Sequence, residues 1–211
     1  MSFRSSEIRH PGPSTGLIRY WIGRIWLRSF GWRTSGELPD TPRVVLIAAP
    51  HTTNWDGAFM IATAWVFRIK LHWIAKKSLV SGPFGGILRT LGAVGVDRNK
   101  PVGQVEQVAE RIRESDGIFL AIAPSGTRSY REHWKSGFYW IALEAGVPIV
   151  PSFLDWGNKH SGVGPAIETT GDIVKDMDQI RAFYDGMTGK YPKKQNPIRL
   201  KEETEAGNQS A

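Results

Sequence analysis

The stretch RVVLIAAPHTTNWD, residues 43–56, decides the fold class. Residues 44–48 are a short run of β-branched and aliphatic side chains, which is typical of a strand buried in a parallel sheet. The polar loop that follows leads into a long helical stretch from Asp56 to Arg68. Because α/β proteins bind ligands in loops beyond the carboxyl ends of parallel strands, this loop is a candidate site.

The same alternation of strands and helices continues toward the carboxyl terminus. Short apolar runs predict further strands at 71–75, 93–96, 117–123 and 147–154. Helical patterns, the first of them a turn with a short helix, lie at 81–91, 105–112 and 137–145. Strands that alternate with helices of about 10–15 residues indicate a single α/β layered domain with a mostly parallel sheet flanked by helices. We assign this domain to residues 40–189.

An amphipathic helix is expected before the domain, within residues 15–33. Its apolar residues recur at helical spacing and form one stripe: Ile18, Trp21, Ile22, Ile25 and Trp26. Three arginines lie off the stripe, and an arginine-rich polar face opposite tryptophan is typical of a helix that lies in a membrane interface. We predict membrane docking, and the alternative is that the stripe packs on the core of the domain.

Polar segments flank these elements at both ends. We expect residues 1–14, with two prolines, to be disordered, and residues 190–211, rich in Lys, Glu, Asn and Gln, to form a solvated tail. The first residues lack the apolar segment of a signal peptide, and no uncharged apolar run approaches the ~18 residues that span a bilayer. If the protein meets a membrane, we expect it to lie on the surface.

Composition narrows the class of partner. The 211 residues carry a net charge of +7, nine tryptophans and no cysteine. A basic balance suits partners that bear phosphate, such as nucleic acid, anionic lipid or a coenzyme-A-bearing substrate. Because Lys and Arg are spread along the chain without a known nucleic-acid motif, we expect no nucleic-acid partner. Disulfides and thiolate metal sites are excluded, and the five histidines lack metal-ligand spacing, so we expect no metal and no cofactor.

His51 and Asp56 are the candidate catalytic pair, because both lie in the loop after the first predicted strand. A carboxylate that holds one ring nitrogen of a histidine fixes the tautomer, and the other nitrogen can then act as a general base. The alternative is that Asp56 only caps the helix that follows.

Two further strings follow predicted strands and should lie at the same edge of the sheet. In APSGTRS, residues 123–129, small and hydroxyl-bearing residues can point backbone N–H groups at an anion, and arginine can bind phosphate with two hydrogen bonds. The candidate phosphate-binding residues of this region are Ser125, Gly126, Thr127, Arg128 and Lys135. Arg98, at the end of GVDR, residues 95–98, is another. An ordinary turn and a surface pair of Asp97 with Arg98 are the alternatives.

Taken in order, four blocks resemble the glycerophospholipid acyltransferase family, to which the 1-acylglycerol-3-phosphate acyltransferases belong. They are the His-x4-Asp motif and the strings VDR, GTR and VPIVP, at 51–56, 96–98, 126–128 and 147–151. The family usually has Glu before Gly-Thr-Arg, whereas this chain has Ser125. This departure leaves the acceptor open among lysophosphatidic acid, another lipid alcohol and an amine.

The resemblance implies an O-acyltransferase of phospholipid biosynthesis. It would move a fatty acyl chain from acyl-coenzyme A or acyl-carrier protein to the hydroxyl of a lysophospholipid-type acceptor such as 1-acylglycerol-3-phosphate. His51 would remove the hydroxyl proton, Asp56 would orient the imidazole, and Arg98 and Arg128 would hold the acceptor phosphate.

The resemblance and the basic composition together predict a place at a membrane. We expect a peripheral or monotopic protein at the cytoplasmic face, on an anionic lipid surface. Two rival functions remain. One is a thioesterase that uses the same His–Asp pair to activate water, and the other is a nucleic-acid- or membrane-binding module without catalysis.

Overall fold

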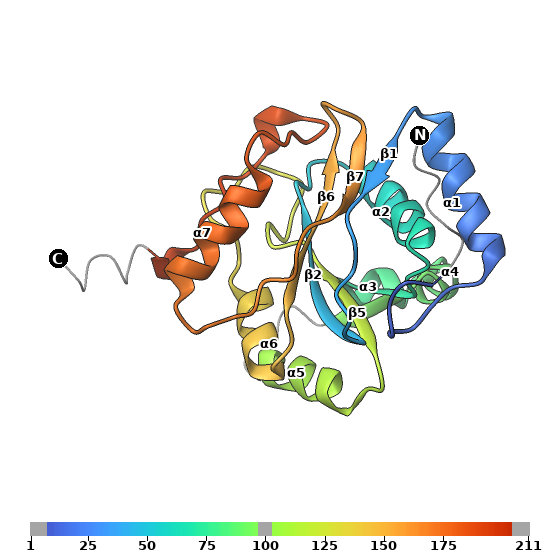
Figure 1. Cartoon of the computed structure of the whole chain (residues 1–211). Coiled ribbons are helices and arrows are strands. Elements are labelled where there is room, and N and C mark those ends of the chain that lie inside the picture. Colours follow the sequence, from blue (N-terminus) through green and yellow to red (C-terminus); the bar gives the residue numbers. More distant parts are fainter. Residues whose placement is uncertain (1–7, 97–102, 204–211) are drawn as a thin grey trace.

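The protein, described from a computed structural model, is defined over residues 8–96 and 103–203. Seven strands form one sheet in the order β1-β7-β6-β2-β5-β3-β4 (Figure 1). The strands are β1 (Arg33–Ser35), β2 (Arg43–Ala49), β3 (Leu71–Lys76), β4 (Ala93–Val96), β5 (Ile118–Ile122), β6 (Ile149–Asp155) and β7 (His160–Val163). The helices are α1 (Leu17–Ser29), α2 (Trp55–Val66), α3 (Lys77–Val80), α4 (Gly85–Thr90), α5 (Gln104–Glu114), α6 (Gly137–Ala145), α7 (Ile173–Tyr184) and the 3₁₀ turn η1 (Pro192–Lys194).

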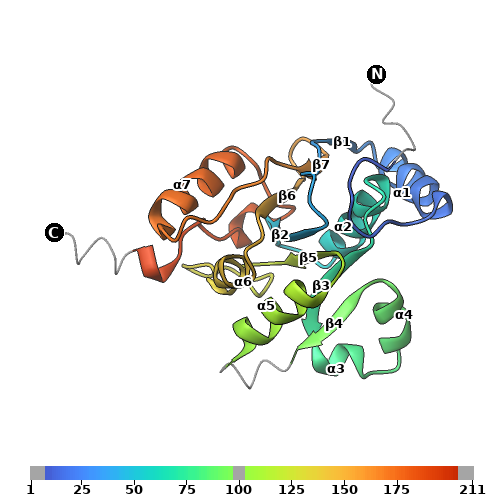
Figure 2. The ribbon, with the colours of Figure 1, turned by 60° about the horizontal axis from the view of Figure 1, so that its bottom comes forward.

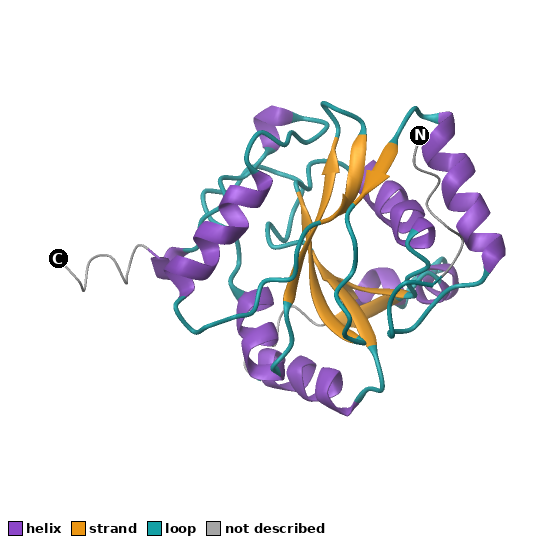
Figure 3. Cartoon of the chain, in the orientation of Figure 1, coloured by secondary structure: helices purple, strands orange, loops and turns teal. Residues whose placement is uncertain are grey.

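The sheet is mostly parallel. Strand β2 pairs in parallel with β5 and β6, and β3 pairs in parallel with β5 and β4. Strand β7 runs antiparallel to β6 and parallel to β1, so these two strands reverse the direction at one edge. The carboxyl ends of the other five strands therefore meet at a common edge. The predicted single α/β domain with a mostly parallel, helix-flanked sheet is confirmed (Figure 3).

Strand β2 lies at the centre of the core because both of its faces are covered. Val44 and Leu46 pack into one apolar cluster with residues of α2 and β3, whereas Val45 and Ile47 pack into another with α5, α6 and α7. All four are at most 2% exposed. This burial on both faces accounts for the continuous apolar run in the sequence. Strands β3 and β4 extend the sheet toward α3 and α4, which lie together at the lower right of Figure 2.

Helix α1 packs on α2 through a face that the sequence pattern did not single out. Tyr20 and Leu27 of α1 are buried. A Cβ atom added at Gly23 would lie 2.5 Å from the carbonyl oxygen of Ala62, so only glycine permits the two helices to approach so closely here.

The predicted apolar stripe of α1 faces mostly outward. Four of its residues are 49–78% exposed: Ile18, Trp21, Ile22 and Ile25. Trp26 is half-buried, with its ring centroid 6.0 Å from that of Phe59. Core packing, the alternative for this stripe, is therefore wrong for the four exposed residues and holds for Trp26. In the part of the chain that the structure describes, no helix is long and apolar enough to cross a bilayer.

Both polar ends are more ordered than the sequence predicted. His10 is buried and its ring meets the edge of Phe119 at 4.9 Å between centroids, and Ser14 forms a β-bridge with Ile69. The predicted disorder of residues 1–14 is wrong from residue 8 onward, and residues 1–7 lie outside the described part.

The predicted tail also differs from the structure. Leu200 is fully buried in the core, and the carbonyl oxygen of Arg199 accepts a hydrogen bond from the backbone N–H of Trp134 at 2.9 Å. The solvated tail predicted from residue 190 is therefore wrong up to residue 203, and the domain continues past its predicted end at residue 189.

Candidate active site

The loop between β2 and α2 folds back onto the first turn of the helix. Because α2 begins at Trp55, Asp56 lies where the positive end of the helix dipole favours a carboxylate. The backbone N–H groups of Thr52 and Thr53 donate to Asp56 Oδ2 at 2.8 and 2.9 Å. The spacing of five residues from His51 to Asp56 thus closes into one tight turn.

His51 and Asp56 are in direct contact, as the sequence predicted. His51 Nδ1 lies 3.1 Å from Asp56 Oδ2. Since an ionised carboxylate can only accept, we assign the proton to Nδ1, which leaves Nε2 as the unprotonated nitrogen. The His51 side chain is 23% exposed and that of Asp56 only 4%. The pair therefore presents a base toward solvent and keeps the orienting carboxylate behind it.

Trp156 supplies a further hydrogen bond to the carboxylate. Its indole Nε1–H donates to Asp56 Oδ1 at 2.8 Å, across 100 positions in the sequence. Its ring meets those of Trp32 and Phe59 edge-on, each at 5.0 Å between centroids. With Oδ1 held by the indole, the carboxylate keeps Oδ2 toward His51. Trp156 was not among the predicted site residues, although its place just after a strand was the available signal.

The turn that carries Trp156 is fixed by a buried neighbour, Asp155. Burial raises the pKa of the Asp155 carboxyl, but hydrogen bonds from Asn158, Thr188 and Gly157 outweigh it and hold the pKa below its ordinary value. The backbone N–H of Trp156 also donates to the carbonyl oxygen of Thr188 at 2.9 Å. The indole is therefore placed by its backbone as well as by its ring contacts.

His51 and Asp56 line a cavity of about 730 Å³. It is lined by residues of α2 and of strands β2, β3 and β5, and its volume lies within the range of ligand pockets. Away from His51 the lining is apolar: Phe67, Ile69, Leu71, Trp73 and Leu91. A cavity with such walls can bury a long alkyl chain, because removal of apolar surface from water is favourable.

Residues 126–128 border the same cavity, in the turn after β5, which is the neighbour of β2. Gly126 has a left-handed backbone (φ +61°), and a Cβ atom there would lie 3.3 Å from Cδ and Cε of Lys135. Lys135 thus packs its alkyl stem over Gly126. Arg128 is exposed at the edge of the cavity. The structure therefore brings Gly126, Thr127, Arg128 and Lys135 together near His51.

The two remaining predicted residues are placed differently. Ser125 is buried, and its hydroxyl donates to the carbonyl oxygen of Thr127 at 2.8 Å, so the hydroxyl is engaged within the turn. Ser125 borders a second, small cavity of about 20 Å³, which His51 and Asn196 also line. Arg98 lies outside the described residues. Among residues 8–96 and 103–203, no three His, Asp or Glu side chains converge as metal ligands.

The edge of the sheet therefore combines a base, an apolar cavity and cations. A hydroxyl next to His51 Nε2 can lose its proton to the imidazole. An alkyl chain can lie in the cavity, while an anion is held against the guanidinium of Arg128 by charge-assisted hydrogen bonds.

Comparison with known proteins gives consistent matches. The family model described as Acyltransferase matches residues 33–155. The chain is similar to the 1-acyl-sn-glycerol-3-phosphate acyltransferase of Haemophilus influenzae, with 31% identity over 157 residues, 69% of this chain and 63% of that protein. It is also similar to the enzyme of that name from Limnanthes douglasii, with 29% identity over 195 residues, 82% of this chain and 68% of that protein. The chain thus spans less than two thirds of the first relative.

A solved structure shares the fold. The crystal structure of the 1-acyl-sn-glycerophosphate acyltransferase from Thermotoga maritima matches with a TM-score of 0.54, at 18% identity, over 78% of this chain and 73% of that one.

Proposed function

The chain belongs to the acyltransferase family, and from this premise we propose that it transfers a fatty acyl chain from an acyl thioester to the hydroxyl of a lysophospholipid-type acceptor such as 1-acylglycerol-3-phosphate. The observation that supports this most directly is the His51–Asp56 contact of 3.1 Å in the lining of a cavity whose walls are otherwise mostly apolar. The relatives in Haemophilus influenzae and Limnanthes douglasii carry the name of this activity.

In the proposed reaction, His51 Nε2 takes the proton of the acceptor hydroxyl as its oxygen attacks the thioester carbonyl carbon. The carbon–sulfur bond then breaks, and the leaving thiolate takes the proton from the imidazolium. Asp56 stabilises the imidazolium and keeps its proton on Nδ1. The apolar cavity holds an acyl chain, and Arg128 with the turn at 125–127 and Lys135 holds the acceptor phosphate. This positioning lowers the entropic part of the barrier.

The test is formation of phosphatidic acid from palmitoyl-coenzyme A and lysophosphatidic acid in detergent micelles. Thioester loss is measured in parallel with and without the acceptor. Acceptor-dependent loss with product formation supports transfer, and loss that is independent of the acceptor indicates a thioesterase. The absence of product with lysophosphatidic acid calls for a panel of lipid alcohols and amines and for acyl-carrier-protein donors. Absence of product across that panel overturns the proposal.

We also propose that α1 docks the enzyme on an anionic membrane surface, at the cytoplasmic face. The support is the outward direction of the stripe, in which Ile18, Trp21, Ile22 and Ile25 are exposed. Exposed tryptophan and aliphatic side chains on a helix with arginines favour insertion among lipid headgroups.

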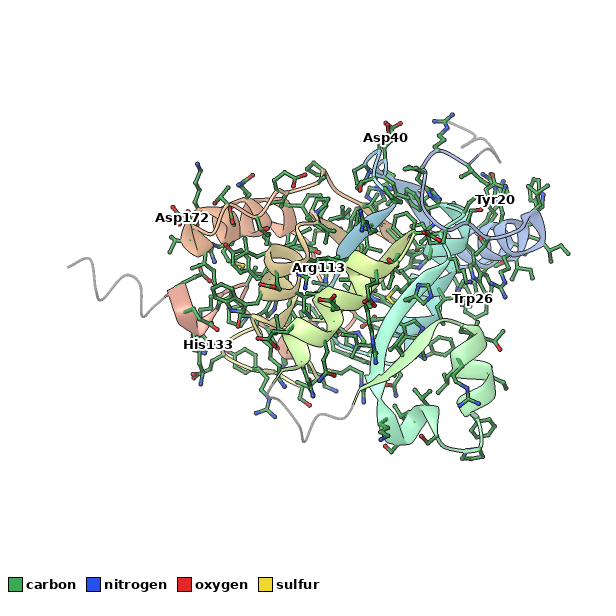
Figure 4. The ribbon with its side chains drawn as sticks, turned by 90° about the horizontal axis from the view of Figure 1, so that it is seen from below. Tyr20, Trp26, Asp40, Arg113, His133 and Asp172 are labelled. Carbon is green, nitrogen blue, oxygen red and sulfur yellow. The ribbon has the colours of Figure 1, made fainter. Side chains whose placement is uncertain are left out.

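The double substitution Ile22→Glu/Ile25→Glu tests docking. We expect partitioning onto anionic vesicles to fall at least about tenfold, since two apolar side chains lose their burial in lipid. Turnover of a water-soluble short-chain substrate should not change. Val174→Glu on α7 is the control, because α7, marked by Asp172 in Figure 4, lies across the molecule from Tyr20 and Trp26 of α1. Equal vesicle binding by the double variant and wild type contradicts docking through α1.

Trp156 is proposed as a positioning residue for the pair. We expect Trp156→Phe to lower kcat about 10- to 100-fold with little change in KM, because a hydrogen bond to a buried carboxylate contributes about 1.5–3 kcal/mol. Trp32→Phe is the matched control, since Trp32 contacts the same ring and loses similar aromatic area. If both variants lose the same activity, the indole acts only through packing.

A further inference from the structure

A basic segment near the catalytic loop has no part in the proposed acceptor site. Residues 186–201, GMTGKYPKKQNPIRLK, contain five basic and no acidic side chains. Lys193 and Lys194 are exposed on η1. Within the described part of the chain, Lys190, Lys193 and Lys194 form no ion pair with a carboxylate. Their positive charge is therefore available to an anion from outside the protein.

The segment lies directly against the catalytic loop. The backbone N–H of Tyr191 donates to Thr52 Oγ1 at 3.2 Å. A Cβ atom added at Gly189 would lie 2.7 Å from Thr52 Cγ2, so a side chain at this position would collide with the loop. The ammonium of Lys190 lies 4.7 Å from the centroid of the Trp156 ring, which bonds to the catalytic carboxylate. Lys190 thus lies beside the side chain that bonds to Asp56, and Lys193 and Lys194 follow it in the same segment.

The segment is also held in one shape. Gln195 Oε1 accepts from the backbone N–H of Gly189 at 2.8 Å, and Gln195 Nε2 donates to the carbonyl oxygen of Met187 at 3.0 Å. Asn196 Oδ1 accepts from the backbone N–H of Arg131 at 3.0 Å, which joins the segment to the loop after β5. Cations on a preorganised backbone bind an anion at a lower entropic cost than cations on a free tail.

The segment lies beside the turn that carries Trp156. In Figure 1 the red segment beyond α7 lies at the top, beside the turn between β6 and β7, and α1 lies at the right edge. The backbone N–H of Trp156, in that turn, donates to the carbonyl oxygen of Thr188, in the segment, so the two are in contact. The segment thus lies beside the turn between β6 and β7, whereas the docking stripe is on α1.

We propose that Lys190, Lys193 and Lys194 bind the phosphate groups of the acyl-thioester donor. This inference rests on the proposed function, in which two substrates both carry phosphate and Arg128 already serves the acceptor. The shared chemistry is the phosphorylated pantetheine arm, which coenzyme A and an acyl-carrier protein both contain. Bound at the lysines, this arm presents its thioester to His51 past Thr52.

The test is the charge reversal Lys193→Glu/Lys194→Glu, assayed in neutral detergent micelles with palmitoyl-coenzyme A and with palmitoyl-acyl-carrier protein. We expect the KM for the donor to rise at least about tenfold at low salt, and the increase to shrink as salt is raised. The KM for the acceptor and kcat should not change. Arg128→Ala should do the reverse and raise only the KM for the acceptor.

The matched control is Arg111→Glu/Lys175→Glu, which makes the same charge change at exposed positions of α5 and α7. An increase with one donor supports the site and identifies that donor's phosphates as the ligand. No increase with either donor, an equal increase in the control, or an equal increase in the KM for the acceptor overturns the site. Weaker binding to anionic vesicles with an unchanged donor KM assigns the lysines to the membrane and also overturns it.

Calorimetric titration with free coenzyme A and with holo-acyl-carrier protein separates this inference from the proposed function, since it needs no turnover. If the charge reversal weakens binding but the protein acylates no acceptor, the donor site is supported and the transfer function is rejected. If the protein transfers acyl chains and the charge reversal leaves the KM for the donor unchanged, the donor site is rejected and the transfer function is retained.

Discussion

Replacing His51 by alanine will lower kcat for acyl transfer about 10³–10⁴-fold, the upper part of the ~10²–10⁴ that general-base catalysis contributes, because no other His, Lys or Glu among the described residues lines the cavity. The fold should be retained, since the His51 side chain is 23% exposed and its removal leaves little empty volume in the core. The measurement is phosphatidic-acid formation in micelles by wild type and His51→Ala, with the thermal midpoint of each from circular dichroism.

His133→Ala is the control for His51→Ala. His133 is also partly exposed but does not border the main cavity, so this variant should keep wild-type activity. If His51→Ala retains more than about a tenth of wild-type kcat while folded, the base is another group and the proposed mechanism is wrong. Acceptor-independent thioester loss that also disappears in His51→Ala would instead identify a thioesterase with the same pair.

The fold was predictable where burial leaves a periodic signal. Strand β2 has a continuous apolar sequence because both of its faces are covered. The helix predicted at residues 137–145 is α6. Strands β1 and β7 were missed because they are only three and four residues long and rich in polar side chains, RTS and HSGV. Helix α7 was missed although its buried residues recur at helical spacing: Met177, Ile180 and Tyr184. That signal could have been used.

Other features depended on tertiary contacts that a local pattern does not contain. The period of α1 identified its apolar stripe, but Gly23 decides which face meets α2. The composition of the segment after residue 190 indicated solvation, yet single apolar residues such as Leu200 anchor it in the core. The pair of His51 and Asp56 was predictable because its two members are close in sequence. Trp156, which completes the site, joins it only through folding.

Asp56→Asn is expected to be nearly as damaging as loss of the base, although it is close in shape. An amide has one acceptor oxygen, and three donors meet the Oδ2 position, namely Thr52 N–H, Thr53 N–H and His51 Nδ1, whereas the indole of Trp156 meets the Oδ1 position. The amide oxygen therefore takes the Oδ2 position, and its NH₂ group faces the indole N–H, so the hydrogen bond from Trp156 is lost. The neutral amide no longer stabilises the imidazolium that forms when His51 takes a proton, and kcat falls by roughly 10²–10³.

The tautomer can be measured directly by ¹⁵N chemical shifts of the His51 ring. We expect the proton on Nδ1 in wild type and in Asp56→Asn, with both proteins folded, so that the loss of activity comes from the lost charge and not from the wrong tautomer. Stability should fall by only about 1 kcal/mol, the usual contribution of a carboxylate in the first turn of a helix. Because the two residues act as a unit, His51→Ala/Asp56→Asn should lose no more activity than His51→Ala alone. Additive losses, or full activity of Asp56→Asn, would show that Asp56 is a helix cap and not the partner of the base.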